Sequence, residues 1–312
     1  MPKYDLKRST QIDAPIETAR ALITDFRRWP DWSPWTVQEP ECQLAYYGDT
    51  AAVGSGYSWN GERIGSGKIT LVDATDGRLD CDLQFVKPFK SQADVRFEFE
   101  SLGESRCKVT WHMHSSMPFF LFFMIPNIKR YVGMDYERGL RMLKELAETG
   151  SVASRVDFKG EQMLPELTYL GVEVELKMSD IPAAMETHYT AMAALIDAEK
   201  LGIAGQPFCD YRLADLKNDR HQMLIGIPIE DTPRREVATY QVGTRAAFHC
   251  ARFDHTGAYE HLGNSWATAM GWVRHHKRKP HKASVGIEIY VNDPAHTPRQ
   301  ELLTELYIPL RG

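Results

Sequence analysis

The sequence predicts an α+β protein made of two domains, each with an antiparallel sheet, and two observations carry that prediction. Residues 42–116 read as successive short strands broken by Gly and Asp turns, and a long helical stretch follows at 128–147. In the second half, Gly226-Ile227-Pro228-Ile229 returns as Tyr307-Ile308-Pro309-Leu310, about 80 residues later. We expect domains at 1–150 and 158–312, separated by the small polar residues that begin at Gly150.

The first half predicts a sheet that curves around its last helix. Tyr4, Leu6 and Ile12 alternate as in a half-buried strand, and Pro15 precedes a short amphipathic helix. Because only one short helix precedes the strands and one long helix follows them, we expect that long helix to cover the sheet, with a cavity between the two.

Three motifs of the first half carry a family resemblance. They are Trp29-Pro30-Asp31-Trp32-Ser33-Pro34-Trp35, Lys87-Pro88-Phe89 and Gly133-Met134-Asp135-Tyr136-Glu137-Arg138-Gly139-Leu140. Over about residues 1–148 the chain resembles the polyketide-cyclase-like branch of the START-related helix-grip superfamily. The resemblance implies a helix-grip fold, but it says little about activity because members bind very different ligands.

Trp32, Trp35 and Asp135 are the candidate ligand-binding residues of the first half. The two tryptophans fit an aromatic pocket rim, but they also fit a loop packed on its own domain. Asp135 comes seven residues after Ile128 and so falls near the apolar stripe of the long helix. It predicts a polar anchor in the cavity, with pairing to a nearby arginine as the alternative.

The repeat in the second half predicts a duplicated unit of strand, helix, strand and strand. Two such copies bury their apolar faces against each other around a pseudo-twofold axis, and the groove between them is a natural ligand site. Tyr259 and Trp266 share one helix face, while Glu288 and Tyr290 share one strand face. Glu305 and Tyr307 repeat that strand pattern. For Glu305 the sequence favours a salt bridge or backbone contact.

The second half also carries a family resemblance. From about 163 to 312 the chain resembles the gyrase-inhibitor-like, or AraC-type effector-binding, domain, whose relatives often accompany a DNA-binding module. The motifs are His255-Thr256-Gly257-Ala258-Tyr259, Glu288-Ile289-Tyr290-Val291-Asn292-Asp293-Pro294 and Thr304-Glu305-Leu306-Tyr307-Ile308-Pro309-Leu310. The resemblance implies an aromatic cleft with one buried glutamate that binds cationic or aromatic small molecules. It places the glutamate at Glu288 and the aromatic wall at Tyr259, Trp266, Tyr290 and Tyr211.

These observations favour intracellular capture or sensing of a hydrophobic small molecule that is cationic or aromatic. The expected ligand-binding residues are Glu288, Tyr290, Trp266, Tyr259, Tyr211, Tyr307, Trp32, Trp35 and Asp135. An alternative is a hydrolase of strained electrophiles, with Glu288 as the base and Tyr259 as a hydrogen-bond donor. A protein-interaction role is a third possibility, supported by family analogy alone.

Composition and charge exclude several other classes. The net charge of −5 and the lack of a helix-turn-helix argue against direct nucleic-acid binding. Five scattered cysteines without a CxxC pair indicate reduced thiols, and the polar N-terminus carries no signal peptide, so we expect a cytoplasmic protein. The apolar run Met117–Ile125 is too short to span a membrane. We expect no membrane contact, no metal and no cofactor.

Overall fold

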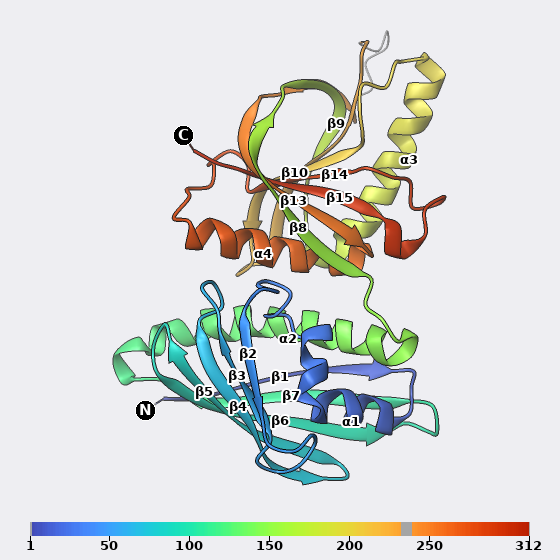
Figure 1. The fold of residues 1–312 in the computed structure, drawn as a ribbon. Helices are drawn as coiled ribbons and strands as arrows, with labels where there is room; N and C mark the ends of the chain where they lie inside the picture. The colour runs from blue at the N-terminus through green and yellow to red at the C-terminus, as the bar shows by residue number, and fades with distance from the viewer. Residues whose placement is uncertain (1, 232–238, 312) are drawn as a thin grey trace. The chain divides into compact units, whose positions relative to one another are not determined.

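The computed structural model describes residues 2–231 and 239–311. Contacts between Cα atoms divide the chain into two compact units, Met1–Val152 and Ala153–Gly312 (Figure 1). We call them unit 1 and unit 2. Each combines one antiparallel sheet with helices, which confirms the α+β prediction. None of the helices in the described ranges combines the length and apolar character that a membrane span requires.

Unit 1 holds a seven-stranded sheet in the order β1-β7-β6-β5-β4-β3-β2. Figure 1 shows this sheet curving against the long helix α2, with α1 near one of its ends. The elements are β1 (Lys3–Ile12), α1 (Ile16–Thr24), the 3₁₀ helix η1 (Phe26–Asp31), β2 (Gln43–Tyr47), β3 (Gly56–Asn60), β4 (Ser66–Thr75), β5 (Arg78–Lys87), β6 (Ser91–Ser101), β7 (Cys107–Ser116), the 3₁₀ helix η2 (Phe119–Met124) and α2 (Ile125–Thr149).

The core of unit 1 follows from alternation on the strands and from the apolar face of α2. On β7, every second side chain from Cys107 onward is buried, as expected for a strand with one covered face. Tyr136 and Leu140 on α2 pack into the same core. The helix ends at Gly150, which adopts a left-handed φ of 83° that a side chain would disfavour.

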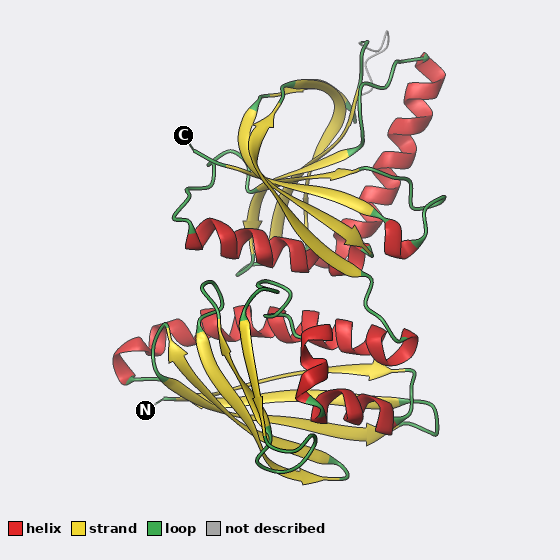
Figure 2. Ribbon diagram, in the orientation of Figure 1, coloured by secondary structure: helices red, strands yellow, loops and turns green. Residues whose placement is uncertain are grey.

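Unit 2 holds an eight-stranded sheet in the order β12-β9-β11-β10-β14-β15-β13-β8, drawn in yellow in Figure 2. The elements are β8 (Ser154–Leu164), β9 (Leu167–Leu176), η3 (Met178–Asp180), α3 (Ile181–Glu199), β10 (Phe208–Asp215), β11 (Arg220–Pro228), β12 (Gln241–Arg245), β13 (Phe248–Gly257), η4 (Tyr259–His261), α4 (Leu262–His275), β14 (Gly286–Tyr290), η5 (Arg299–Glu301) and β15 (Leu303–Pro309).

Strand register places both long helices of unit 2 on one face of its sheet. Directly paired residues share a face, and one such row crosses the sheet through Val172, Ile225, Cys209, Glu288, Leu306 and Phe253. The α3 helix packs at the Ile225 end of this row, and α4 packs at the Phe253 end. Glu288 therefore lies on the helix-bearing face, in the middle of the row, on the central strand β14.

The boundary expected from sequence needs a correction. The expected start at residue 158 falls inside β8, which begins at Ser154 and pairs with β13 of unit 2. The small polar residues after Gly150 suggested a linker, but those from Ser154 onward belong to the edge strand β8. An edge strand with one solvated side tolerates polar side chains, so composition alone does not separate it from a linker.

Candidate functional site

Glu288 is a buried carboxylate that accepts hydrogen bonds from three neutral donors among the described residues. The residue is only 2% exposed. The indole Nε1 of Trp266 donates to Oε1 at 2.6 Å. The hydroxyl of Tyr290 donates to Oε2 at 2.5 Å, and the hydroxyl of Tyr211 donates to the same oxygen at 3.3 Å. We call Glu288, Tyr211, Trp266 and Tyr290 the Glu288 cluster.

Burial changes the pKa values of the ionisable residues in the Glu288 cluster. Burial raises the pKa of Glu288, and the hydrogen bonds from Tyr290, Trp266 and Tyr211 oppose the shift without cancelling it. Burial also raises the pKa of the Tyr211 and Tyr290 hydroxyls, with the charge of Glu288 adding to the effect. Both tyrosines therefore remain protonated donors, and Glu288 is the group of this cluster that titrates.

Arginine and lysine do not compensate the Glu288 charge in the part of the chain that the structure describes. The side-chain groups that act on Glu288 are the three aromatic donors Tyr290, Trp266 and Tyr211. An isolated buried carboxylate is costly unless a positive charge or strong donors approach it. The cluster thus offers a desolvated negative charge without an internal counter-ion.

Aromatic rings surround the carboxylate and remain partly exposed. The Tyr211 and Trp266 rings meet edge to face with centroids 5.2 Å apart, and Tyr259 meets Tyr290 in the same way at 5.7 Å. Tyr189 of α3 was not among the site residues predicted from the sequence, and its ring lies 6.1 Å from that of Tyr290. Sequence periodicity does not reveal this contact, because it depends on how α3 packs against β14 in the folded protein.

Local sequence explains how Trp266 reaches Glu288. A Cβ atom on Gly286 would lie 2.4 Å from the Trp266 ring, so this position of β14 admits no side chain while the indole keeps its place. With the ring seated on Gly286, its N–H points to the carboxylate two residues further along the strand. The glycine and the glutamate therefore act together in placing the indole.

Tyr307 does not join the cluster, which corrects its assignment as a ligand-binding residue. In the pairing of β14 with β15, Leu306 lies opposite Glu288, so Tyr307 faces the other side of the sheet. There its hydroxyl donates to Glu305 at 2.7 Å, and Glu305 pairs with Arg252 at 2.8 Å. The salt bridge favoured for Glu305 is therefore present.

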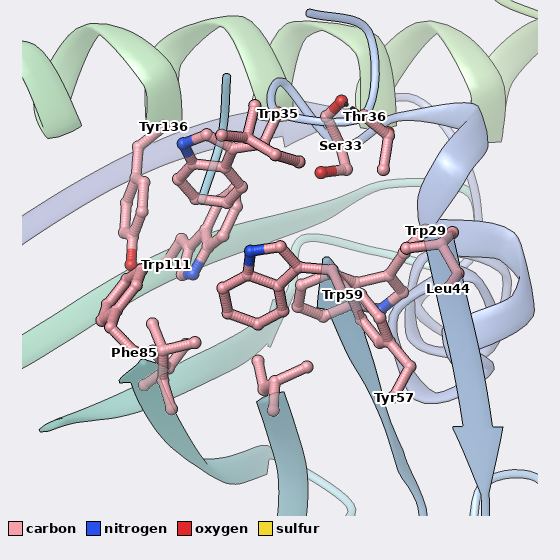
Figure 3. A pocket seen from close by; sticks show the side chains of 14 residues that line it. Trp29, Ser33, Trp35, Thr36, Leu44, Tyr57, Trp59, Phe85, Trp111 and Tyr136 are labelled. Atoms are coloured by element: carbon pink, nitrogen blue, oxygen red, sulfur yellow. Dashed lines mark hydrogen bonds between the residues drawn. The ribbon is translucent and has the colours of Figure 1, made fainter. Parts of the chain in front are cut away.

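Unit 1 contains a separate, mostly apolar cavity of about 90 Å³ (Figure 3). Trp35 lines it, as the sequence analysis expected, together with aromatic residues from the sheet and from α2. Aliphatic side chains complete the wall. The lining residues are Trp29, Ser33, Trp35, Thr36, Leu44, Tyr57, Trp59, Ile64, Ile69, Leu83, Phe85, Val95, Trp111 and Tyr136.

Two buried polar atoms of this wall lack hydrogen-bond partners among the described residues. They are the indole Nε1 of Trp111 and the hydroxyl of Ser33, and both residues are 1% exposed. The Trp111 ring is held in place by stacking on Tyr136, with centroids 3.9 Å apart. A buried donor without an acceptor costs about 1–3 kcal/mol, so a guest that accepts a hydrogen bond would recover that cost.

Trp32 and Asp135 adopt the alternatives that the sequence left open rather than the ligand-binding roles. Trp32 is fully buried in the core and donates its indole N–H to the Leu22 carbonyl at 3.3 Å, so it does not line the cavity. Asp135 pairs with Arg138 at 2.6 Å and also accepts a hydrogen bond from Trp35. The next residue, Tyr136, is the one that α2 turns into the cavity.

In comparisons with known proteins, each half of the chain matches a family model. Residues 4–148 match the family of polyketide cyclase / dehydrase and lipid transport proteins. Residues 161–311 match the GyrI-like small molecule binding domain. The two halves match two different families. Both resemblances noted in the sequence are thereby confirmed. No curated protein sequence matches the chain.

Several solved structures are similar to part of the chain. The crystal structure of the EcmrR C-terminal domain is 17% identical, with 51% of this chain and 98% of that chain covered and a TM-score of 0.41. SAV2435 bound to tetraphenylphosphonium is 17% identical, with coverages of 50% and 94% and a TM-score of 0.39. A solution structure from Thermobifida fusca is 18% identical, with coverages of 46% and 92% and a TM-score of 0.38.

The described residues contain no group of three or more His, Cys, Asp or Glu side chains that is arranged to hold a metal ion. The Glu288 cluster offers a carboxylate, phenol and indole donors and aromatic rings.

Proposed function

We propose that the GyrI-like unit captures a hydrophobic cationic molecule at the Glu288 cluster and that the chain acts as an intracellular sensor of such molecules. The observation that carries the proposal is a carboxylate that is 2% exposed and surrounded by partly exposed aromatic rings. A cation entering between those rings would supply the missing counter-charge. Family membership supports small-molecule binding in general.

The strand order supports a duplication as the origin of this site. One half of the sheet runs β9-β11-β10 and the other runs β14-β15-β13, so corresponding strands lie at equal distances from the centre. We infer two copies, β9-α3-β10-β11 and β13-α4-β14-β15, related by a pseudo-twofold axis between β10 and β14. The inferred axis passes beside the Glu288 cluster, and only the second copy supplies the carboxylate.

The energetics favour aromatic or otherwise apolar cations over small hydrated ions. Each aromatic ring facing a cation contributes about 0.5–2 kcal/mol of cation–π attraction. Among the described residues, Glu288 and the two phenols bonded to it offer a small inorganic cation too few oxygen ligands to replace its hydration shell. A lipophilic cation has little hydration to lose and buries its own apolar surface.

The first experiment measures binding of tetraphenylphosphonium, a permanently charged aromatic cation, to the full chain by calorimetry. Glu288→Gln keeps shape and volume, so we expect the fold to persist and the affinity to fall by about 2–5 kcal/mol. The matched control is Glu305→Gln, which removes a carboxylate from the opposite face of the same sheet and should leave the affinity unchanged. Tetraphenylborate has the same shape with a negative charge and should not bind. Equal affinity of the wild type and Glu288→Gln would refute the proposal.

The hydrolase alternative remains a prediction that the same variants separate from binding. If Glu288 acts as a base, Glu288→Gln abolishes turnover of an epoxide while its affinity for a neutral substrate is nearly unchanged. The Tyr259 ring lies against Tyr290, so Tyr259→Phe would keep this packing and remove only the hydroxyl. Turnover that survives both substitutions would exclude Glu288 as the base and Tyr259 as the donor, and an absence of turnover in the wild type would argue against a hydrolase.

For unit 1 we propose a second binding site, in the cavity beside Trp111. The cavity of about 90 Å³ is smaller than the ~150 Å³ cavity that accepts benzene in an engineered protein, so a ring requires a shift of the lining side chains. The unpartnered indole N–H and the Ser33 hydroxyl favour a small apolar molecule that carries one hydrogen-bond acceptor.

The test compares benzonitrile with phenylacetylene, two molecules of nearly equal shape of which only the nitrile is a good acceptor. We expect benzonitrile to bind the wild type more tightly, by about 1–3 kcal/mol. Trp111→Phe retains a ring against Tyr136 and removes the donor, so it should abolish this preference. Trp29→Phe is the matched control, because the Trp29 N–H already donates to the Ile23 carbonyl at 2.8 Å. Equal affinities for the two molecules in the wild type would argue against the proposal.

A further inference from the structure

A run of exposed aromatic side chains lies between β7 and α2 of unit 1. In η2, Phe119 is 75% exposed, Phe120 is 73%, Phe122 is 53% and Phe123 is 64%. The Phe119 and Phe122 rings stack with centroids 5.7 Å apart, so the phenylalanines contact one another while most of their surface faces solvent. Single exposed apolar residues are ordinary, but a contiguous group of this size marks an interaction surface.

A second exposed apolar segment lies at the same end of the sheet. Lys3 pairs with Ser116 at the end of β7, and Ala93 near the start of β6 pairs with Ser115. The turn that joins β5 to β6 therefore lies beside the start of η2. This turn carries Phe89, which is 63% exposed, and follows Val86, which is 53% exposed. We call residues 86–91 and 117–131 together the aromatic end of unit 1.

The aromatic end is positively charged although the whole chain is acidic. Its two segments contain four basic residues and no Asp or Glu, whereas the chain carries a net charge of −5. Lys3 adds a further positive charge at the same end, by the strand pairing given above. The nearest acid along β1, Asp5, is paired with His114. The basic residues of the two segments are Lys87, Lys90, Lys129 and Arg130.

We propose that the aromatic end docks unit 1 onto an anionic phospholipid bilayer. Phenylalanines enter the boundary between headgroups and acyl chains, and lysines and arginines attract the negatively charged surface. The η2 segment Phe119–Met124 is far too short to span the hydrocarbon core, so it would lie in the interface. This differs from the expectation of no membrane contact, which considered only membrane-spanning segments.

Charge favours a bilayer over a second copy of the chain. A symmetric dimer through this surface would bring the same basic residues of both copies together, and like charges repel. The bilayer supplies the opposite charge and the apolar phase at once. Ile64 and Phe85, which line the unit 1 cavity, lie near this end because Ser66 pairs with Lys87. Docking there would bring the cavity wall close to membrane-dissolved molecules.

The experiment is co-sedimentation of the full chain with vesicles of phosphatidylcholine alone or mixed equally with phosphatidylglycerol. We expect binding to the anionic vesicles, weakened by salt. Lys87→Gln combined with Lys90→Gln should lower the partition coefficient roughly thirty-fold, since each basic residue near the surface contributes about 1 kcal/mol. Phe119→Ser combined with Phe123→Ser should lower it at least about tenfold.

Val53→Ser combined with Val72→Ser is the matched control. It removes two exposed apolar side chains, 61% and 50% exposed, from the other end of the same sheet and should leave vesicle binding unchanged. Circular dichroism checks that each variant keeps its fold. No binding by the wild type, or equal loss in the control, would overturn the proposal. A wild-type dimer in sedimentation velocity that Phe119→Ser with Phe123→Ser dissociates would assign the surface to a second copy instead.

Discussion

Glu288 illustrates how burial sets the charge of a single residue. Because burial raises its pKa, part of the apo population carries a neutral carboxylic acid at a pH where an exposed glutamate is fully ionised. A cation bound as we propose would stabilise the ionised form of Glu288. Ligand binding would then be linked to the release of a proton.

This linkage predicts a pH dependence of binding. Only ionised Glu288 attracts a cation, so the affinity for tetraphenylphosphonium should rise with pH through the raised pKa of Glu288. The stability of the ligand-free protein should change in the opposite direction. With a folded-state pKa above the unfolded one, its stability is fully present at lower pH and is lost as the pH rises through the folded pKa.

Calorimetry across pH measures the affinity, and Glu288→Gln should flatten its pH profile. Glu305→Gln should keep it, since Glu305 is paired with Arg252 on the opposite face. A wild-type affinity that does not change with pH would show that the charge of Glu288 does not contribute to cation binding.

For single residues, the sequence predicted a role correctly where that role depends on spacing within one helix or strand. Glu288 and Tyr290 on one strand and Trp266 on one helix face meet as expected, and Trp35 lines the unit 1 cavity. The prediction that Tyr307 joins the site was wrong, because which side of the sheet a residue faces depends on how its strand pairs with its neighbour. For Asp135 the alternative holds, because Arg138 lies one turn further along α2 and pairs with it, while Tyr136 enters the core.

The junction of β13 with α4 shows how an element boundary is fixed by a buried histidine. His255 is fully buried; its Nε2 donates to the Ala258 carbonyl at 3.1 Å, and the Ser265 hydroxyl donates to Nδ1 at 2.9 Å. These bonds tie the strand, the turn at Gly257 and the first turns of the helix together. Burial lowers the pKa of His255 to about 4, so the residue is neutral in the folded protein.

The lowered pKa predicts acid destabilisation of unit 2. The unfolded chain takes up the proton near the ordinary histidine pKa of ~6.5, while the folded protein resists protonation down to about 4. Stability is therefore lost as the pH falls through this window, by about 3 kcal/mol at ~1.4 kcal/mol per pKa unit.

Urea unfolding at several pH values measures this loss. His255→Gln keeps a donor for Ala258 and should remove the contribution, although it lowers stability at neutral pH. His296→Gln changes a histidine whose side chain is 84% exposed and should leave the acid dependence unchanged. Identical pH profiles of the wild type and His255→Gln would contradict the prediction.

At the scale of elements, strong periodicity was enough to predict the regular parts of the fold. The short strands expected over 42–116 correspond to β2 through β7, and the helical stretch expected at 128–147 corresponds to α2. The order of strands in the sheet could not be read in the same way. Pairing joins residues far apart in the chain, and periodicity reports only which residues of one strand share a face.

At the scale of the whole molecule, the boundary between the units depends on which sheet each strand pairs with. The β8 strand follows directly after unit 1 but pairs along its length with β13, so it belongs to unit 2. Its first residues also support the turn before α4: the Ala258 amide donates to the Ala153 carbonyl, and Asn264 donates to the Ser154 hydroxyl. A fragment that omits them would lose these contacts and expose part of β13.

We therefore predict that fragments 1–152 and 153–312 each fold alone, because every strand keeps its partners in one of them. The fragment 158–312 should also fold, but with a free energy of unfolding lower by roughly 2–5 kcal/mol, from the loss of several hydrogen bonds worth about 0.5–1.5 kcal/mol each. Urea unfolding followed by circular dichroism compares the two C-terminal fragments directly. If 153–312 failed to unfold cooperatively, or if 158–312 were equally stable, then β8 would not contribute to unit 2 as its pairing with β13 requires.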